Sequence, residues 1–511
     1  LLPGDDNGAP DVFLQDRQEA FPRLVSVRAD GLGSGDGPSG QPALSDDGRY
    51  AAFISGATNL VTEDANGRPD LFRRDLVSGI TTLVPSGFPS SGAVAAAATF
   101  AMSRNGQRFV WLQRESGSTR IVFRDMTEAS ARSLANGPAC AAPAISGDGS
   151  TAGFVRQGNA FVYSIAQDRL SPALSGGNAV VSILLTTDAS RVLVFRLTGG
   201  PSVFEKSSDG LWVPIAYPGQ SIEFRTSTDG VLSADDRWLA FAGVMAGTPR
   251  PSTNGNLGLQ TFVMNLTTGQ TTQVSRTAFG DVPDGDSDRP AFSPDGRHLI
   301  YRSAAGNLVA DDDNQVSDLF LVDRTTGVTR LASRSPITGV PWESRSVRGR
   351  FGMGNGELWM QTFATSPLAG DFNGAPESVR WNLPPDTDGD GLNDRLEQEW
   401  FGGLGQKGSG DLDQDGMSNA DELAAGTDPT RSDSVLAVRI LEEPNGGWTI
   451  AWPSVAGRRY RVLTAESLVF GSFATWEPQG GVLTATGPLL ETRVDQSDRE
   501  TGRYFRLSVA D

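Results

Sequence analysis

Short runs of alternating apolar and polar residues fill most of the chain, and turns rich in Asp, Asn and Gly separate them. Alternation with a period of two predicts β-strands with one buried face. An Asp-Gly or Asn-Gly pair between two such runs predicts a hairpin in which both turn residues have positive φ. This hairpin recurs about every 51 residues, as SDDGRYAAF (45–53), SRNGQRFVW (103–111), SGDGSTAGF (146–154), TTDASRVLVF (186–195), SADDRWLAF (233–241), SPDGRHLIY (293–301) and, in degenerate form, GMGNGELWM (352–360).

Two more strands follow each hairpin. The third has a central aromatic or apolar residue, as in DLFRRD (70–75) and DLFLVD (318–323), and the fourth comes after a turn, as in ITTLVP (80–85) and VTRLAS (328–333). Four antiparallel strands per repeat at this period predict the blades of a β-propeller, so the fold class is all-β.

The strand count predicts seven blades. Seven hairpins and seven fourth strands are present, and the fourth strand PRLVSV (22–27) precedes every hairpin. We expect it at the outer edge of the last blade, where it would cover an open edge. Third strands number eight because both DVFLQD (11–16) and ESVRWN (377–382) qualify. Eight blades are therefore the alternative, if residues are missing before Leu1.

The repeats resemble a known family. The hairpin S-x-D-G-R-x-x-x-F, followed by N-L-V-x-x-D-x-N-G-x-x-D-[LV]-F-x-x-D, is similar to the TolB-like propeller repeats over residues 1–384. The resemblance implies the fold but no single function, because such propellers serve as binding platforms, enzyme scaffolds and surface proteins. The chain starts inside a repeat, at LLPGDDNGAPDVF, so we expect that a leader, if not more, has been removed.

A different pattern follows the repeats. The stretch DTDGDGLNDRLE (386–397) has the ligand spacing of an EF-hand calcium loop, with Gly391 at its sharp turn. Its predicted ligands are the side chains of Asp386, Asp388, Asp390, Asp394 and Glu397 and the backbone carbonyl of Leu392. A second loop, DLDQDGMSNADE (411–422), offers the side chains of Asp411, Asp413, Asp415, Asn419 and Glu422 and the carbonyl of Met417.

The two loops predict Ca²⁺ as the cofactor. Without a cation the clustered carboxylates repel one another, so the segment should be poorly ordered when calcium is absent. The paired loops resemble dockerin and thrombospondin type 3 segments, and more closely the DxDGDGxxNxxEYxxGTDP linkers of secreted bacterial proteins. Dockerins bind a cohesin partner through their helices, but no duplicated recognition pair is visible here. We therefore interpret residues 385–432 as a structural spacer.

A weaker acidic pattern, D-x-N-x-x-x-[DE], occurs in the repeats. It could hold a cation, but Asp and Asn also form side-chain–backbone turns without one, which is the interpretation we prefer. The sequence does not decide between them for Asp5/Asn7/Asp11, Asp64/Asn66/Asp70, Asp312/Asn314/Asp318 and Asp371/Asn373/Glu377.

Strands return after the loops. Six short runs within residues 433–511 predict a small β-sandwich, similar to the fibronectin- or immunoglobulin-like C-terminal modules of secreted bacterial proteins. Its expected core aromatic residues are Trp448, Trp452, Tyr460, Trp476 and Tyr504. Anchoring, sorting and sugar binding are all open as roles for this module.

Charge and composition exclude several classes of function. The net charge is −18, which argues against binding to nucleic acid or to anionic membranes. No apolar run reaches the length of a membrane span. The single histidine, His298, and the single cysteine, Cys140, are expected as ordinary strand residues, so neither a Ser-His-Asp triad nor a Cys/His zinc site is predicted.

Three hypotheses about function follow. The first is a secreted, non-enzymatic propeller that binds a protein or glycan at the cell surface, or associates with itself, and that is stiffened by calcium. The second is a carbohydrate-active enzyme that uses two propeller carboxylates, although no pair stands out among the acidic residues and no catalytic residue is assigned. The third is a self-assembling subunit of a surface layer or filament.

Overall fold

The structure is a computed structural model that describes residues 5–15, 22–64, 67–85, 93–94, 100–115, 118–137, 139–171, 174, 180–217, 224–246, 258–277, 283–309, 312, 314–325, 327–334, 342, 345–351, 357–362, 377–382, 386, 388, 390, 392–425, 427–443, 447–454, 459–465, 477–478, 483–487, 489–495 and 504–510. The chain divides into two compact units, Leu1–Thr228 and Asp229–Asp511, which we describe separately. The division falls inside a strand of the repeat array. The domain boundaries expected at 384 and 432 therefore stay predictions.

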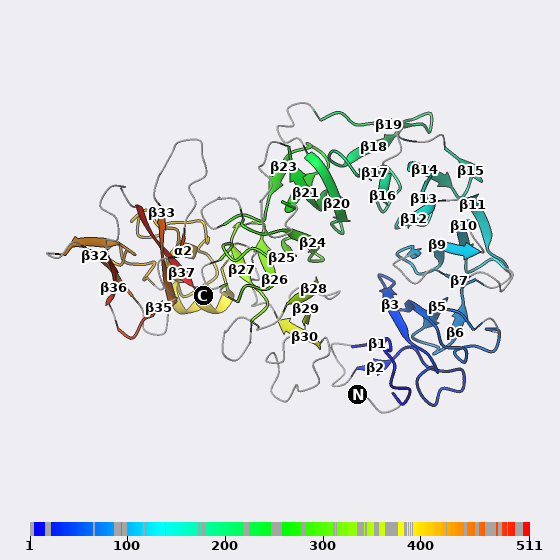
Figure 1. Ribbon diagram of the computed structural model, residues 1–511, viewed down its shortest axis with the longest axis horizontal. Coiled ribbons are helices and arrows are strands. Elements are labelled where there is room, and N and C mark those ends of the chain that lie inside the picture. The colour runs from blue at the N-terminus through cyan, green and yellow to red at the C-terminus, as the bar shows by residue number, and fades with distance from the viewer. Residues whose placement is uncertain are drawn as a thin grey trace. The chain divides into compact units, whose positions relative to one another are not determined.

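The first unit is a series of antiparallel sheets, coloured blue to cyan in Figure 1. A short pair, β1 (Phe13–Leu14) and β2 (Arg23–Leu24), comes first. The sheets that follow consist of β3 (Ser39–Leu44), β4 (Tyr50–Ser55), β5 (Asp70–Asp75) and β6 (Thr81–Leu83); β7 (Ala93–Val94), β8 (Phe100–Met102), β9 (Arg108–Glu115), β10 (Ser118–Asp125) and β11 (Arg132–Gly137); β12 (Cys140–Ile145), β13 (Thr151–Arg156), β14 (Asn159–Ser164) and β15 (Arg169–Leu170); and β16 (Val180–Leu185), β17 (Arg191–Arg196), β18 (Ser202–Lys206) and β19 (Trp212–Pro214).

The second unit continues the series and adds a different tail. Its repeat sheets consist of β20 (Phe224–Leu232), which begins before the division, β21 (Trp238–Met245), β22 (Gln260–Asn265) and β23 (Thr271–Gln273); β24 (Ser287–Phe292), β25 (His298–Ser303), β26 (Asp318–Asp323) and β27 (Thr329–Leu331); and β28 (Ser346–Phe351), β29 (Glu357–Thr362) and β30 (Glu377–Asn382). The chain is thus all-β in its repeats, with propeller-like sheets of four strands in sequence order. The strands of all seven predicted hairpins pair, from β3–β4 to β28–β29, and the turn of the seventh, residues 352–356, lies outside the described residues.

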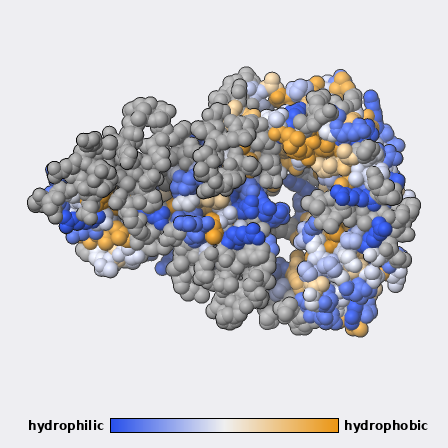
Figure 2. Space-filling view, viewed as in Figure 1, coloured by the Kyte–Doolittle hydropathy of each residue, from blue (hydrophilic) through white to orange (hydrophobic). Residues whose placement is uncertain are grey.

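Apolar side chains pack between successive sheets. Phe53 of β4 belongs to a core that reaches back to Val12 and Val25, whereas Ile54, the next residue, packs with Phe109 and Trp111 of the following sheet. Every residue of β4 is buried, as expected for a strand covered on both faces. Figure 2 shows hydrophilic and hydrophobic residues intermixed on the visible described surface. This packing of four-stranded sheets is propeller-like.

The hairpin turns differ from the prediction in one respect. In the six hairpins whose turns the structure describes, only the fourth residue of the S-x-D-G motif has positive φ, between 55° and 72°. In the first hairpin, the N–H of Ser45 donates to the carbonyl of Tyr50 at 2.9 Å, so four residues, 46–49, connect the strands instead of two. The prediction of two positive-φ positions was wrong because a side chain stabilises a different turn. These fourth residues are Gly48, Gly106, Gly149, Ala189, Asp236 and Gly296.

The stabilising side chain is the first serine or threonine of the turn. In the first repeat, the Ser45 hydroxyl donates to Asp47 and accepts the N–H of Tyr50 at 2.9 Å, while Asp47 accepts the N–H of Arg49 at 3.0 Å. All six turns have this set of bonds, so the S-x-D-G signature encodes a hydrogen-bonded unit. The other five turns are those of Ser103, Ser146, Thr186, Ser233 and Ser293.

Neighbouring turns of the first unit are also bonded to each other through the main chain. The N–H of Asp46 donates to the carbonyl of Arg104 at 2.8 Å, and the N–H of Arg104 donates to the carbonyl of Gly147 at 2.9 Å. The N–H of Asp148 reaches Thr187 in the same way at 2.7 Å. Each turn therefore fixes the next sheet in place.

The register shifts within the first strand of five sheets, β3, β12, β16, β24 and β28, which the sequence analysis missed. In β3, β12 and β24, a non-glycine residue at the shift has a φ near 50°. Each of these residues precedes a proline, in the shared pattern x-P-A followed by an apolar residue. The pairs are Gln41–Pro42, Ala142–Pro143 and Arg289–Pro290.

The N-terminal fourth strand has a partner within the first unit. Strand β2, within PRLVSV, pairs with β1, with Phe13 opposite Leu24. Strand β30, within ESVRWN, is the third strand of its own sheet in the second unit. The expected place of PRLVSV at the edge of the last blade stays a prediction.

The tail contains two short helices and two small sheets. Helix α1 (Asp394–Trp400) and helix α2 (Asn419–Ala425) follow the two acidic loops. One sheet consists of β31 (Arg439–Glu442), β32 (Gly447–Pro453) and β36 (Leu489–Asp495), and the other of β33 (Arg459–Ala465), β34 (Glu477–Pro478), β35 (Leu483–Thr484) and β37 (Tyr504–Ala510). Neither helix has the length and apolar character to span a bilayer, in the part of the chain that the structure describes.

The two small sheets share one core. Trp452 and Tyr460 are fully buried, and their ring centroids lie 5.8 Å apart. Trp448 is only partly buried, whereas Trp476 and the side chain of Tyr504 lie outside the described residues. Two of the five aromatic residues expected in the core are therefore confirmed there.

Candidate metal centre

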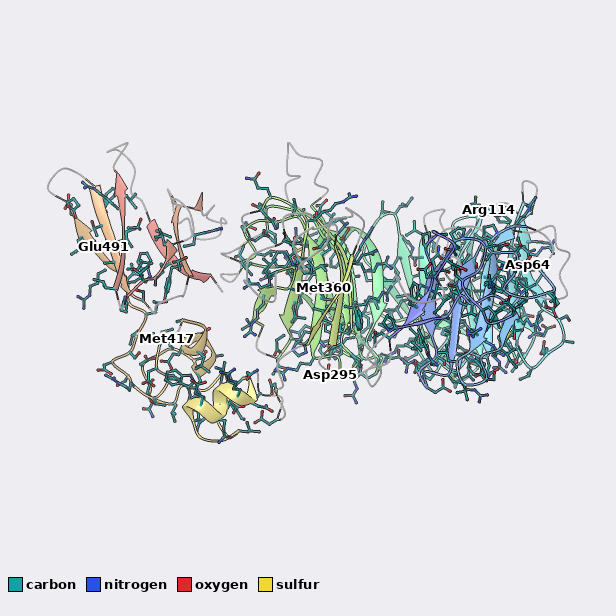
Figure 3. The ribbon with its side chains drawn as sticks, turned by 90° about the horizontal axis from the view of Figure 1, so that it is seen from below. Asp64, Arg114, Asp295, Met360, Met417 and Glu491 are labelled. Carbon is teal, nitrogen blue, oxygen red and sulfur yellow. The ribbon has the colours of Figure 1, made fainter. Side chains whose placement is uncertain are left out.

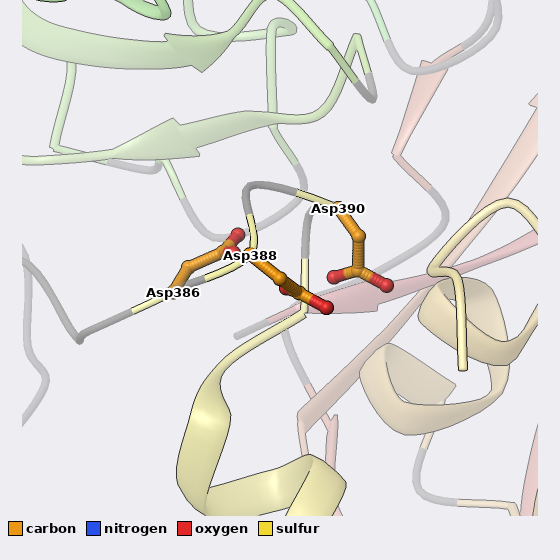
Figure 4. A group of neighbouring side chains, drawn as sticks. All are labelled: Asp386, Asp388 and Asp390. Atoms are coloured by element: carbon orange, nitrogen blue, oxygen red, sulfur yellow. The ribbon is translucent and has the colours of Figure 1, made fainter. Parts of the chain in front are cut away.

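The first acidic loop brings three aspartates together. One carboxylate oxygen from each of Asp386, Asp388 and Asp390 lies within 4.8 Å of the other two. Figure 4 shows the three side chains gathered just before helix α1. The helix begins after Asn393, whose Oδ1 accepts the N–H of Arg395 at 2.9 Å. This N-cap fixes where the loop ends and the helix starts.

Glu397 completes the first loop from inside the helix. Its side chain is 0% exposed, and neither carboxylate oxygen has a hydrogen-bond partner among the described residues. Burial first, and then the charges of Asp390, Asp388 and Asp386, raise its pKa from 4.5 to about 7. A buried carboxylate without a donor costs considerable free energy, so its oxygens fit a cation that they would bind.

The second loop repeats this arrangement. Asp411, Asp413 and Asp415 also place one oxygen each within 4.8 Å of the other two. Glu422 is 0% exposed, and its Oε2 has no partner among the described residues. Burial, and then Asp413 and Asp415, raise its pKa to about 7. In both loops, therefore, the three aspartates converge and the glutamate predicted as the last ligand is buried beside them.

The backbone of the loops is held by the aspartates themselves. The N–H groups of Leu392 and Met417, whose carbonyls are predicted ligands, donate to Asp390 and Asp415 at 2.8 and 2.7 Å. Asp411 accepts the N–H of Gly416 at 3.0 Å, and Gly416 has a φ of 98°, which favours glycine. Figure 3 shows Met417 in the turn that leads into helix α2.

Two predicted ligands have other roles in the structure. Asp394 starts helix α1, and its charge contributes to the raised pKa of Glu397. Asn419 is fully buried; its Oδ1 accepts the N–H of Leu412 at 3.2 Å, and its Nδ2 donates to the carbonyl of Lys407 at 2.9 Å. Asn419 therefore braces the second loop, and its role as a ligand stays a prediction.

The segment between the loops packs against the first loop. Asp390 Oδ2 of the first loop accepts the N–H of Gly408 at 3.1 Å. A Cβ on Gly408 would lie 3.2 Å from the carbonyl oxygen of Asp390 and 3.3 Å from Cγ of Leu392. This close approach explains a glycine at that position, and it joins the loops into one unit.

The weaker acidic pattern forms hydrogen-bonded turns at two of its four places. Asn7 Nδ2 donates to Asp11 at 3.0 Å, its Oδ1 accepts the N–H of Ala9 at 2.6 Å, and the Ser26 hydroxyl also donates to Asp11. The same bonds recur at Asn314, Val316, Asp318 and Ser333. At these two places the asparagine and serine bind the last aspartate of the pattern, and whether the first aspartate, Asp5 or Asp312, binds a cation stays untested.

The other two places are described only in part. Asp64 and Asp70 are buried, but Asn66, Asp371 and Asn373 and the side chain of Glu377 lie outside the described residues. Metal binding there stays untested.

The lone histidine and cysteine are ordinary strand residues. Burial lowers the pKa of His298 in β25, and burial raises the pKa of the Cys140 thiol in β12. Their predicted structural roles are consistent with these positions.

Comparison with known proteins gives one family match. The model of the bacterial TSP3 repeat matches residues 386–398 and 411–432. No functionally curated protein is similar enough to match the chain.

Several solved structures share a distant similarity of fold. TolB from Acinetobacter baumannii is 15% identical with a TM-score of 0.32, over 58% of this chain and 64% of that one, slightly less than two thirds of its length. The β-propeller domain of the Trilobed protease from Pyrococcus furiosus is 9% identical with a TM-score of 0.40, over 68% and 93%. An oligogalacturonate lyase from Vibrio parahaemolyticus is 11% identical with a TM-score of 0.42, over 74% and 99%.

These structures are too distant to assign an activity. The family match covers the two acidic loops and their helices, the same residues that form the paired clusters. Residues 386–398 and 411–432 are thus similar to a calcium-binding repeat of bacteria.

Proposed function

We propose that the chain is a secreted, calcium-binding and non-enzymatic β-propeller protein that serves as an extracellular binding or assembly platform. In this proposal, residues 1–384 form seven blades, residues 385–432 are a calcium-stabilised spacer, and residues 433–511 are an immunoglobulin- or fibronectin-like sandwich. Support for the propeller comes from consecutive four-stranded sheets that pack face to face.

The observation that carries the proposal is the burial of Glu397 and Glu422. Each closes a loop whose aspartates already converge, and both oxygens of Glu397 and Oε2 of Glu422 have no donor among the described residues. Ca²⁺ takes six to eight oxygens and would neutralise much of this charge. Extracellular calcium is concentrated enough to fill even weak loops of this type.

The partner is proposed as a protein, a glycan or a second copy of the chain. The net charge of −18 disfavours polyanions. It also favours solubility of a platform that presents many turns to solvent. The proposal assigns no catalytic residue.

The test is thermal unfolding with saturating calcium and with a chelator. We expect calcium to raise the melting temperature of the transition that includes residues 386–432. A Glu397→Gln, Glu422→Gln double variant should lose most of this rise. Identical melting curves in calcium and chelator would refute the proposed spacer, and saccharide turnover in an activity screen would refute the non-enzymatic role.

A further inference from the structure

Arg297 connects the first acidic loop to one of the repeat sheets. It lies in the turn between β24 and β25, where its Nε and Nη2 donate to Asp323 at 3.1 and 2.6 Å. Its Nη2 also donates to Oδ2 of Asp386, the first predicted calcium ligand, which is 89 residues away in sequence. Figure 3 labels Asp295 of the same turn, whose carboxylate accepts the N–H of Arg297.

The bond to Asp386 is an addition to a pattern found elsewhere in the chain. Arg49 occupies the same place in the first turn, and its Nε and Nη2 donate to Asp75 at 3.2 and 2.9 Å. The Arg49 side chain is 51% exposed, whereas that of Arg297 is 14% exposed. Arg297 therefore makes the ion pair of its own sheet and donates a further hydrogen bond to the acidic loop.

Asp386 has two carboxylate oxygens, so it can serve both partners. Arg297 donates to Oδ2, and one carboxylate oxygen of Asp386 lies in the cluster with Asp388 and Asp390. In the second loop, the corresponding Asp411 accepts main-chain N–H groups of its own loop, from Asp415 and Gly416. The first loop differs in that a side chain from a repeat sheet orients its first aspartate.

We propose that Arg297 is a positioning residue that couples calcium in the first loop to the turn of the β24–β27 sheet. This inference rests on the proposed calcium binding. When the ion binds Asp386, the carboxylate can no longer move freely. The Arg297 guanidinium that donates a hydrogen bond to this carboxylate is then held in place as well. The turn at residues 293–298 then exchanges its amide protons more slowly, and the loop is attached to the repeats at a defined point.

The test is hydrogen exchange of the full chain with saturating calcium and with a chelator. In the natural protein we expect calcium to slow exchange in residues 293–298 about tenfold, the effect of one charge-assisted hydrogen bond. In Arg297→Gln, calcium should still slow exchange in residues 386–422 but no longer in the turn. Arg49→Gln is the matched control: it loses the equivalent pair with Asp75, and the turn at 293–298 should keep its calcium response.

A second variant controls for a general loss of stability. Asp386→Asn leaves the Arg297–Asp323 pair intact and should abolish the response of the turn while residues 411–422 still respond. A calcium response of the turn that persists in Arg297→Gln or in Asp386→Asn would overturn the coupling. The absence of any calcium response in residues 386–422 of the natural protein would instead refute the proposed function.

Discussion

At the scale of single residues, the most informative side chains are the two glutamates that close the acidic loops. Glu397 and Glu422 are the last predicted ligands of their loops, and both are fully buried. Burial of a carboxylate opposes folding unless a partner is present. The same residue should therefore destabilise the calcium-free protein and stabilise the calcium-bound one.

Glu397→Gln separates these two effects. We expect the calcium affinity of the first loop to fall at least about tenfold, because a bidentate carboxylate is lost. In chelator, the same variant should melt at a higher temperature than the natural protein, because a buried negative charge has been removed. Calorimetric titration and thermal unfolding measure the two changes. Glu399→Gln, at an exposed position of the same helix, is the control and should change neither.

The pH dependence follows from the raised pKa values. Both glutamates titrate near 7 in the calcium-free fold instead of at 4.5. Their contribution to stability is thus fully present below pH 4.5 and is lost as the pH rises through about 7. Calcium binds the ionised form. We expect the rise in melting temperature on adding calcium to be larger at pH 8 than at pH 5, and equal rises would contradict the assignment.

At the scale of elements, the repeated turn explains both what could be predicted and what could not. The bounds of β5 and β26 equal the third strands expected from the sequence, because alternation and flanking turns are local signals. The predicted turn type was wrong because the hydrogen bonds of the serine hydroxyl in S-x-D-G stabilise a turn with only one positive-φ residue. The bulges before Pro42, Pro143 and Pro290 depend on pairing with another strand, which no single strand reveals.

The acidic loops show which contacts a sequence can predict and which it cannot. Ligand spacing lies within twelve residues, so the sequence alone indicates which carboxylates converge. The bond between Arg297 and Asp386 joins residues 89 positions apart, and nothing in either motif signals it. The contact of Gly408 with the first loop was missed for the same reason.

Two turn glycines provide a matched pair for a stability test. Gly48 has a φ of 68° and open space where a Cβ would lie, so Gly48→Ala should cost about 1–2 kcal/mol from backbone strain alone. Gly106 has a φ of 67°, and a Cβ there would lie 2.8 Å from Cβ of Tyr50. Gly106→Ala should therefore cost about 1–3 kcal/mol more. Urea unfolding measures both, and equal losses would show that neighbouring sheets do not pack this closely.

At the scale of the whole molecule, the proposed calcium segment separates two β regions. With a chelator, repulsion among its carboxylates should open residues 386–422, while the hydrogen-bonded sheets stay closed. We expect limited proteolysis in chelator to cut this segment first and to release a C-terminal fragment of about 9–13 kDa. Calcium should slow this cut strongly. Equal cleavage rates in both conditions, followed by mass spectrometry, would count against an ordering role for the metal.

The main-chain bonds between successive turns have a consequence for how such a protein can evolve. Backbone groups of Asp46, Arg104 and Gly147 fasten one repeat to the next, so the bonds themselves need no particular side chain. In the four turns that these bonds join, that place is taken by Asp, Arg, Gly and Thr, and at Gly147 a Cβ would lie only 2.7 Å from Thr187 of the neighbouring turn. Where the side chain has room, substitutions at this place can thus change the surface while the bonds that join the repeats are kept.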